Sequence, residues 1–327
     1  MTNVLVTGGA GYIGSHICKA LAGAGHTPVA YDDLSRGHRS FVKWGLLIEA
    51  DVLDTSALVR ALTAHGIEAV IHCAALAYVG ESWERPLDYF RINVNGAVSL
   101  MDAMKHTGVD RLVLSSSCSV YGAPDVLPVT EDAPLEPISP YGRTKALVEQ
   151  MTETCATAYG FKVTALRYFN AAGADPDGEI GEIHDPETHV IPNAMRAALD
   201  DDYRLPVLGT DFGTPDGSAI RDFIHVSDIA QAYVCGVQWL LHGKASQIFN
   251  LGSGRGYSVL QVISAVSKLT GQKLKISAAP RRPGDCASLQ ADVTRVAQAL
   301  GWSAQRSSLD MIIRDAQRWQ QGGGYAQ

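Results

Sequence analysis

The feature that most constrains the fold of this 327-residue chain is a glycine-rich turn close to its start. Val4–Thr7 is a short apolar segment typical of a buried strand, and Ile13–Ala24 repeats apolar residues at helical spacing. The glycines of the turn are Gly8, Gly9, Gly11 and Gly14. They satisfy G-x-G-x-x-G, in which one glycine makes the turn, one lets a pyrophosphate approach the backbone and one lets helix and strand pack closely. The segment predicts a dinucleotide site, with the phosphates at the helix start beside Tyr12 and Ile13.

Apolar segments alternate with helical patterns through the first half of the chain. The expected strands are Pro28–Tyr31, Leu46–Ala50, Ala69–Cys73, Arg111–Ser115 and Val163–Tyr168, and the expected helices include Thr55–His65, Phe90–Lys105 and one opened by Ser139-Pro140. Wholly apolar strands separated by helices indicate a parallel sheet that is covered on both faces. We therefore predict an α/β fold with a doubly wound, Rossmann-type sheet.

The amino-acid composition of the chain changes after Asn170. Residues 171–190 and 203–222 are rich in Asp, Glu, Gly and Pro, and loops of this length are usually functional. The chain length fits two domains at about 100–200 residues each. We expect residues 1–170 with about 223–250 to form the dinucleotide domain. Residues 171–222 with 251–327 would form a smaller C-terminal α/β substrate-binding domain.

An acidic residue favours NAD as the dinucleotide. Asp32 ends the second expected strand, 18 residues after Gly14. A carboxylate there accepts hydrogen bonds from the adenine-ribose hydroxyls and repels a 2′-phosphate, so NAD is favoured over NADP. Arg36 is near enough to leave NADP as an alternative. The residues expected around this ribose are Asp33, Leu34, Ser35, Arg36 and Gly37.

Two more strand ends are candidates for coenzyme contact. Asp51, followed by Val52, comes after the third strand and is placed to contact adenine. Cys73-Ala74-Ala75 follows the fourth strand, where small side chains let the backbone approach the coenzyme. Ordinary packing at the strand ends explains both segments equally well.

A tyrosine and a lysine form the expected chemical centre. Tyr141 and Lys145 are four positions apart on one helix and therefore share a face. A tyrosine with a pKa of about 10 is a poor base at neutral pH, but a nearby lysine charge and a helix N-terminus both favour the phenolate. Ser117, at the end of the fifth strand, offers a hydroxyl that can hydrogen-bond a substrate alcohol.

Composition excludes several classes of protein. The formal charge is −7, and no basic run is longer than Arg281-Arg282, so we expect no nucleic-acid or membrane partner. No segment approaches the ~20 apolar residues of a membrane-spanning helix. The six cysteines form no Cys-x-x-Cys pair, so we expect no metal site and a reducing, cytoplasmic location.

These motifs together resemble the extended short-chain dehydrogenase/reductase family over nearly the whole chain. The segments that carry the resemblance are Thr7–His16, His72–Ser82, Ser115–Gly122, Ser139–Lys145, Arg167–Gly173, Arg221–Val226, Asn250–Gly254 and Ala279–Asp285. The resemblance implies that Tyr141 is the acid/base, that Lys145 tunes it and holds the nicotinamide ribose, and that Ser117 is the hydroxyl partner. It also places Phe169 and Ala77 beside the coenzyme.

Within this family the chain is most similar to enzymes that invert C4 of a UDP-sugar. The resemblance implies the interconversion of UDP-glucose and UDP-galactose, with hydride passing from C4 to a tightly held NAD and returning to the opposite face of the rotated sugar. It implies a UDP-sugar site as well. Its residues would be Ser117, Tyr141, Asn170, His189, Val190, Arg221, Arg282, Asp285 and Leu289.

Departures from the family pattern leave alternatives open. Ala77 stands where some relatives have a lysine, Ile92 where many have an asparagine, and Leu289 where some bacterial relatives have a tyrosine. Epimerisation of UDP-xylose/UDP-arabinose or of UDP-N-acetylglucosamine therefore remains an alternative. A 4,6-dehydratase would carry Thr-Asp-Glu where this chain has Ser117-Cys118-Ser119, and a non-enzymatic dinucleotide sensor would dispense with Tyr141 and Lys145. The resemblance further implies a homodimer built on helices Phe90–Lys105 and Tyr141–Tyr159.

Overall fold

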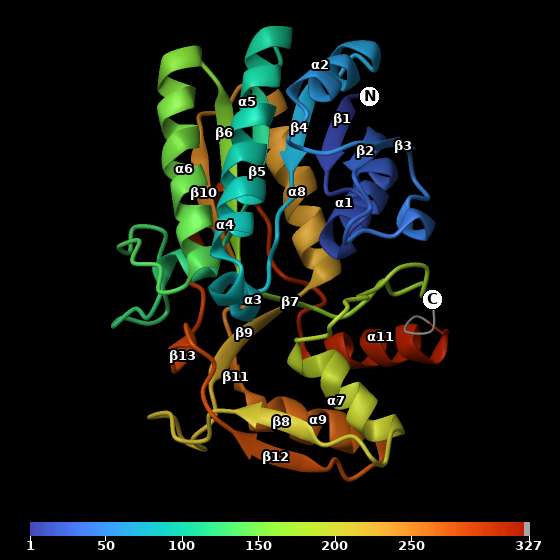
Figure 1. The fold of residues 1–327 in the computed structure, drawn as a ribbon, viewed down its shortest axis with the longest axis vertical. Helices are drawn as coiled ribbons and strands as arrows, with labels where there is room; N and C mark the ends of the chain where they lie inside the picture. The colour runs from blue at the N-terminus through green and yellow to red at the C-terminus, as the bar shows by residue number, and fades with distance from the viewer. Residues whose placement is uncertain (324–327) are drawn as a thin grey trace.

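The larger part of the molecule is a seven-stranded sheet in which every pairing is parallel. A computed structural model, which describes residues 1–323, gives the strand order β10-β6-β5-β4-β1-β2-β3 (Figure 1). The strands are β1 (Asn3–Thr7), β2 (Thr27–Asp32), β3 (Leu46–Glu49), β4 (Ala69–His72), β5 (Arg111–Ser117), β6 (Lys162–Tyr168) and β10 (Gln247–Leu251). The order reverses between β1 and β4, and ligands of such sheets bind at the carboxyl ends of the strands beside this point.

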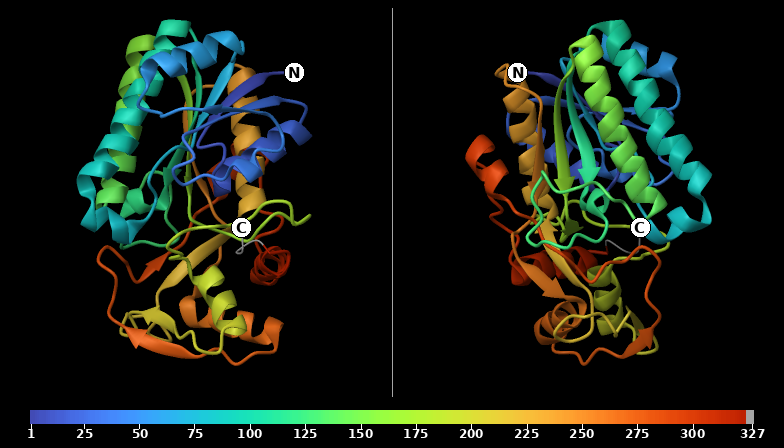
Figure 2. Two further views of the ribbon diagram at one scale, coloured as in Figure 1. Left: turned by 45° about the vertical axis from the view of Figure 1, so that its right-hand side comes forward. Right: turned by 90° about the vertical axis from the view of Figure 1, so that its left-hand side faces the viewer.

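Helices cover both faces of this sheet, as Figure 2 shows. One face carries α1 (Tyr12–Gly23), α8 (Val226–Leu241) and α10 (Thr294–Leu300), and the other carries α2 (Thr55–Ala64), α5 (Gly96–Thr107) and α6 (Pro140–Tyr159). Side chains alternate between the faces, as a strand requires: Val4 and Val6 join the first apolar cluster and Leu5 joins the second. The doubly wound α/β architecture predicted from the sequence is therefore confirmed.

Short helical segments lie between the main elements. They are η1 (Arg39–Phe41), α3 (Val79–Glu84), α4 (Pro86–Tyr89), η2 (Phe90–Asn95) and η3 (Cys118–Tyr121). The η2 segment is a π-helix that leads directly into α5, whereas the sequence predicted one uniform helix over Phe90–Lys105. The cap at the start of α6 is as predicted: Ser139 Oγ accepts a hydrogen bond from Gly142 N, and Pro140 begins the helix.

The smaller part lies at the carboxyl ends of the large sheet's strands (Figure 1). Its strands are β7 (Asn170–Ala172), β9 (Ile220–His225), β11 (Gly256–Ser258) and β13 (Ser288–Leu289), with β8 (Leu205–Leu208) and β12 (Ile276–Ala279) in a separate parallel pair. Its helices are α7 (Val190–Leu199), α9 (Val259–Thr270) and α11 (Leu309–Gln321), which enclose a third apolar cluster.

The structure differs from the expected division of the chain at two places. β9 pairs with β7, β11 and β13, so the chain returns to the large sheet at Val226 rather than at about residue 223. α10 and Trp302 pack into the apolar cluster beside α1 and α8, although residues 251–327 were expected in the smaller domain. The last residues of that expected domain, 324–327, lie outside the described part of the chain.

Candidate active site

The glycine-rich turn leaves open space at the start of α1. Gly8 has a φ of +71°, and a Cβ there would lie 2.8 Å from Ala74 N, because the turn passes close to the end of β4. A Cβ on Gly14 would overlap Gly8 O. At Gly11, however, a Cβ would meet only Gly8 O, at 3.4 Å. The first-turn N–H groups of a helix have no partners within the helix, so this opening at Gly11 suits an anionic group.

Asp32 at the end of β2 is buried and fixes the neighbouring loop. Its Oδ2 accepts a hydrogen bond from Ala10 N at 3.0 Å, and its Oδ1 accepts one from Leu34 N at 2.9 Å. Burial raises the pKa of Asp32, and these two backbone donors oppose that rise. Leu34 has a φ of +59°, a left-handed conformation that non-glycine residues seldom adopt and that clusters at ligand sites. Asp33 Oδ1 accepts hydrogen bonds from the backbone and the hydroxyl of Ser35.

Arg36 is engaged by protein groups. Its Nη2 lies 2.6 Å from Glu81 Oε1, its Nη1 donates to Asp185 O at 3.2 Å, and its guanidinium carbon lies 5.3 Å from the centre of the Tyr78 ring. These contacts hold the charge that would otherwise attract a 2′-phosphate. The geometry therefore favours NAD over the NADP alternative.

The other expected coenzyme residues surround the same edge of the sheet. Asp51 is exposed and its side chain accepts from Leu53 N, while its carbonyl accepts from the buried Tyr31 hydroxyl. Val52 is buried. Cys73, Ala74 and Ala75 are half-buried and Ala77 is exposed.

Ser117, Tyr141 and Lys145 come together at the end of β5. Ser117 is the last residue of β5, two residues beyond the predicted strand end; its hydroxyl donates to Ser119 Oγ at 3.1 Å and also interacts with the Tyr141 hydroxyl, whose pKa it lowers. Lys145 Nζ donates to Ser115 O at 2.8 Å and lies 5.9 Å from the centre of the Tyr141 ring. All three side chains are buried. The helical face predicted to carry Tyr141 and Lys145 thus meets the end of the neighbouring strand.

Without a ligand, Tyr141 is less acidic than a free tyrosine, whereas the sequence predicted a more acidic phenol. Burial raises the pKa of Tyr141 to about 12, and the hydrogen bond from Ser117 opposes this rise. Burial also lowers the pKa of Lys145 to about 8. Desolvation outweighs the neighbouring lysine because that ammonium is directed at the Ser115 carbonyl and not at the phenol oxygen. A phenolate here needs a further positive charge.

Two arginines from the smaller part converge on one carboxylate. Asp285 Oδ1 lies 3.5 Å from Arg221 Nη2 and 3.2 Å from Arg282 Nη2. A Cβ on Gly80 would lie 3.6 Å from Arg282 Cδ, and one on Gly284 would lie 3.2 Å from Ser139 Cβ. Arg282 and Gly284 are therefore held against α3 and the N-terminus of α6, close in sequence to Tyr141.

Leu289 and Phe169 join this group to the strand ends. Both are buried in one apolar cluster with Cys118, the residue after Ser117. Leu289 lies opposite Arg221 in the β13–β9 register. Asn170 begins β7 and is half-buried. Arg281, by contrast, pairs with Asp211 at 2.7 Å, away from Asp285.

His189 is the residue before α7 and is held by two acids. Its Nδ1 lies 2.7 Å from Glu182 Oε1 and 3.1 Å from Glu187 Oε1. Burial would lower the pKa of His189, but these carboxylates raise it to about 10. Val190 is the first residue of α7 and is half-buried. No contact in the described residues links His189 or Val190 to Tyr141, so the structure leaves their expected place near the nucleotide as a prediction.

Comparison with known proteins identifies the family. Residues 4–252 match the family described as "NAD dependent epimerase/dehydratase family". A UDP-glucose 4-epimerase of Rhizobium meliloti (strain 1021) is 45% identical over 97% of this chain and 96% of its own length. The chain belongs to the NAD-dependent epimerase/dehydratase family. This confirms the resemblance inferred from the sequence motifs.

Solved members of this epimerase/dehydratase family share the whole fold. The crystal structure of UDP-glucose 4-epimerase from Brucella ovis in complex with NAD is 50% identical, with a TM-score of 0.94 over 97% of this chain and 98% of that one. A UDP-glucose-4-epimerase from Stenotrophomonas maltophila, with bound NAD and formylated UDP-arabinopyranose, is 40% identical, with a TM-score of 0.95 over 100% of both chains.

Sequence reasoning missed two residues that position the site in this family member. The Tyr89 ring packs edge-on against the Tyr141 ring at 6.4 Å, and its hydroxyl accepts a hydrogen bond from Tyr78 N. Asn93, in the π-helical segment η2, accepts from Leu76 N and donates to Leu76 O and Thr144 Oγ1. In the sequence, Asn93 stood out only as the residue after Ile92, the position that departs from the family pattern. A buried amide inside a helical pattern was the signal for its role.

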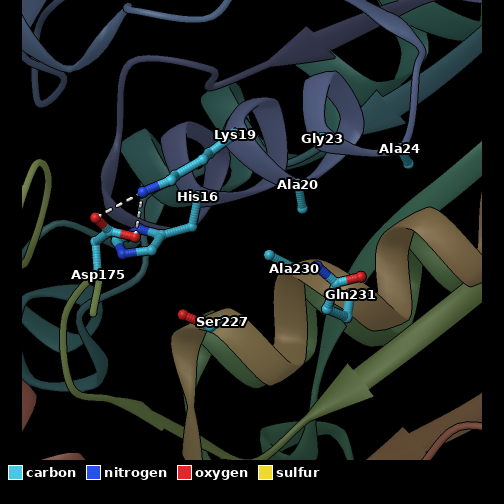
Figure 3. Close-up of a pocket in the computed structure, with 9 residues that line it drawn as sticks. All are labelled: His16, Lys19, Ala20, Gly23, Ala24, Asp175, Ser227, Ala230 and Gln231. Carbon is cyan, nitrogen blue, oxygen red and sulfur yellow. Dashed lines mark hydrogen bonds and ion pairs between the residues drawn. The ribbon is translucent and has the colours of Figure 1, made fainter. Parts of the chain in front are cut away.

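A surface hollow of about 380 Å³ lies elsewhere, between α1 and α8. Figure 3 shows its lining, which includes His16, Lys19, Asp175 and Gln231. None of the predicted site residues lines it. The hollow is therefore separate from the predicted site at Ser117 and Tyr141.

No helix in residues 1–323 is long and apolar enough to cross a lipid bilayer.

Proposed function

We propose that this chain inverts C4 of UDP-glucose and UDP-galactose, using bound NAD. The observation that carries the proposal is the meeting of Ser117, Tyr141 and Lys145 at one edge of the sheet, between the open glycine turn and the Arg221–Arg282–Asp285 group. Relatives named UDP-glucose 4-epimerase, matched along almost their full length, support the same activity.

The residues present fit a dinucleotide coenzyme. The opening at Gly11 would receive the pyrophosphate, Asp32 the adenine ribose, and Lys145 the nicotinamide ribose. The predicted loop Asp33–Gly37 and the strand ends at Asp51 and Cys73 would complete the site. NAD, when bound, supplies the acceptor that takes hydride from C4 and gives it back.

Tyr141 moves the proton of the sugar's 4-hydroxyl. Its oxygen takes this proton as C4 is oxidised and returns it as C4 is reduced, while the Ser117 hydroxyl hydrogen-bonds the same alcohol. Burial raises the pKa of Tyr141, so the proton transfer depends on positive charge brought close to the phenol. The enzyme is therefore poised to ionise Tyr141 only when the site is filled.

The arginine pair holds the UDP diphosphate. Arg221 and Arg282 are suited to bind phosphate oxygens in paired hydrogen bonds, and Asp285 already orients both guanidinium groups and would contact the uridine ribose. Anchoring the nucleotide at this end leaves the sugar free to turn over between the two hydride transfers. Asn170, His189, Val190 and Leu289 are assigned to the surrounding pocket.

The chain divides by role into a coenzyme part and a substrate part. The coenzyme part consists of residues 1–170, residues 226–251 and α10, and the substrate part consists of most of the remaining residues.

We further propose a homodimer through α5 and α6, which both expose apolar side chains, among them Val98 and Leu147. Six free cysteines support a reducing, cytoplasmic location.

The test is to incubate the purified protein with UDP-glucose without added NAD and to identify the products. UDP-galactose should form, because the coenzyme stays bound through the reaction. UDP-xylose and UDP-N-acetylglucosamine serve as competing substrates, since Leu289 leaves the sugar preference open in sequence. Formation of a dehydrated 4-keto-6-deoxy sugar, or no turnover of UDP-glucose by NAD-loaded protein, would contradict the proposal.

A further inference from the structure

A second cluster of reactive side chains lies on the segment between β7 and α7. Glu182, His184, Glu187 and His189 fall within eight residues, in the pattern Glu-x-His-x-x-Glu-x-His. One ligand atom from each of them lies within 4.8 Å of all the others. Ligand atoms of two imidazoles and two carboxylates thus lie close together.

The distances between these atoms suit a small cation. Glu182 Oε1 lies 2.7 Å from His189 Nδ1 and 3.1 Å from His184 Nδ1, and Glu187 lies 3.1 Å and 3.7 Å from the same two nitrogens. Ligands about 2.1 Å from a tetrahedral zinc ion are about 3.4 Å from one another. The observed distances bracket that value, so small shifts would complete a four-ligand site.

Burial leaves part of this cluster with partners only inside the cluster. Glu182 is buried, with 5% of its side chain exposed, and Glu187 and His184 expose 16% and 19%. Among the described residues, Glu182 Oε1, His184 Nδ1 and Glu187 Oε2 have no hydrogen-bond partner outside the cluster, and their close polar neighbours are one another and His189 Nδ1. Buried polar atoms normally find partners in the surrounding protein, so a group whose atoms face only one another leaves a place for a central cation.

We propose that Glu182, His184, Glu187 and His189 bind one divalent transition-metal ion, zinc in the first instance. Imidazole nitrogens and carboxylate oxygens are donors that zinc accepts, and two of each supply the four ligands of a tetrahedral site. The sequence expectation of no metal site rested on cysteine spacing, and this cluster contains no cysteine. The proposal is independent of the substrate assigned to the active site.

A neighbouring cluster of three carboxylates is already neutralised by a lysine. Asp175, Asp177 and Glu179 also converge, but all three contact Lys19 Nζ, at 2.8, 2.8 and 2.6 Å. A lysine ammonium already occupies the position that a cation would take; Figure 3 shows its link to Asp175. We therefore assign no metal to this second cluster.

The proposed ion would fix the 182–189 segment against the coenzyme side of the molecule. The His184 ring packs edge-on against Tyr12 at 6.2 Å and Tyr78 at 5.4 Å, and Tyr12 follows the glycine turn. Arg36, from the loop after β2, donates to Asp185 O within the same segment. Zinc bound here would join these elements and hold the coenzyme loop in place.

The test measures zinc directly on the full-length protein. The chain is loaded with zinc chloride, desalted and analysed for metal content; a parallel sample is loaded with cobalt for its visible spectrum. We expect a single zinc per chain, intense tetrahedral cobalt bands, and a fall in Tm of several degrees after chelation, because structural metal binding contributes to folding. Loss of all zinc on desalting, or octahedral cobalt bands, would overturn the proposal.

Variants locate the ion. His184→Asn and Glu182→Gln should each weaken zinc binding by about 100-fold or more, since changes to residues outside the ligand shell already cost about 10–100-fold. Asp177→Asn in the satisfied cluster and His106→Asn on the surface are matched controls that should keep the zinc. Equal zinc retention by His184→Asn would overturn the assignment. If that variant does not fold, the cobalt spectrum and zinc content of the wild-type protein still decide.

Discussion

At the residue scale, the central fact is that the protein buries a phenol and an ammonium side by side. Desolvation raises the pKa of Tyr141 to about 12 and lowers the pKa of Lys145 to about 8. Both shifts disfavour the charged form of the side chain. The site therefore holds both groups closer to neutrality than water does. Charge brought by ligands then has a large effect on them.

Removing the phenol oxygen should abolish proton transfer. Tyr141→Phe is expected to lower kcat by about 10²–10⁴-fold, the usual contribution of a positioned acid/base. The fold should persist, because the Tyr89 contact involves the ring and not the hydroxyl. Tyr159→Phe, at an exposed tyrosine of the same helix, is the control and should leave kcat unchanged. Near-normal turnover by Tyr141→Phe would remove it from the mechanism.

Ser117 should set the pH at which Tyr141 works. Its hydrogen bond lowers the pKa of Tyr141, so Ser117→Ala should move the rising limb of the pH–rate profile to higher pH. Each unit of that rise lowers the ionised fraction at fixed pH about tenfold. Ser117→Thr, which keeps a hydroxyl, should move the profile back. A profile that is identical in wild type and Ser117→Ala would contradict the pairing.

Lys145 should destabilise the ligand-free protein at neutral pH. Its pKa is lowered to about 8 from 10.5, so the unfolded chain binds more protons between these values and the stability of the wild type rises with pH there. Lys145→Met should raise the free energy of unfolding at pH 7 by about 1–3 kcal/mol while turnover is lost. Urea denaturation at pH 7 and 10.5 measures this.

The gain from Lys145→Met should shrink as pH rises toward 10.5. Lys273→Met, at an exposed lysine, should change stability little at either pH. If Lys145→Met is less stable than wild type at pH 7, the hydrogen bond to Ser115 outweighs desolvation.

At the element scale, the predicted site residues come together because they lie at or next to the carboxyl ends of the parallel strands. β5 delivers Ser117, α6 delivers Tyr141, and the turn after β1 opens at Gly11, because parallel strands bring their carboxyl ends to one edge. The π-helical segment η2 adds Asn93, which fixes the loop at Leu76. Such π segments are frequent at functional sites, where they redirect a side chain.

Two glycines of the turn should separate coenzyme binding from folding. Gly11→Ala meets only Gly8 O at 3.4 Å and has no positive φ, so the protein should fold but bind NAD about tenfold or more weakly. Gly14→Ala would overlap Gly8 O and should destabilise the fold by about 2 kcal/mol or more. Melting curves with and without NAD distinguish the two. Equal NAD affinity in Gly11→Ala and wild type would place the pyrophosphate elsewhere.

At the scale of the whole molecule, the smaller part lies at the sheet edge and supplies Arg221 and Arg282, the proposed anion site. Arg282 and Gly284 pack near Gly80 and Ser139, so residues more than 140 positions apart in sequence form one wall. The proposed dimer surface includes the exposed face of α6, whose buried face carries Tyr141. Neither the wall nor the dimer surface can be predicted from the spacing of residues within one element.

Charge placed on the proposed dimer face should separate the subunits. Leu147→Glu on α6 and Val98→Glu on α5 put a carboxylate at exposed apolar positions, and burial of an unpaired charge should weaken association by about 100-fold or more. Light scattering at micromolar concentration should give a dimer mass for wild type and a monomer mass for the variants. Leu199→Glu, on α7, is the control. A monomeric wild type would exclude the dimer.

The sequence by itself determined the fold class and the shared helical face of Tyr141 and Lys145, because both follow from short-range spacing. The glycine turn, the apolar strands and the Tyr141–Lys145 face each depend on residues within one or two turns of one another. The ends of elements were less well predicted: β5 extends to Ser117, and β9 belongs to the smaller sheet.

Tertiary structure decided the electrostatics and the long-range partners. Burial raises the pKa of Tyr141 against the expected effect of Lys145, and Glu81 takes up the charge of Arg36. The convergence of Arg221 and Arg282 on Asp285 likewise depends on how β9 meets a distant loop. Desolvation and pairing depend on which segments exclude water from one another, and a local pattern carries no information about that.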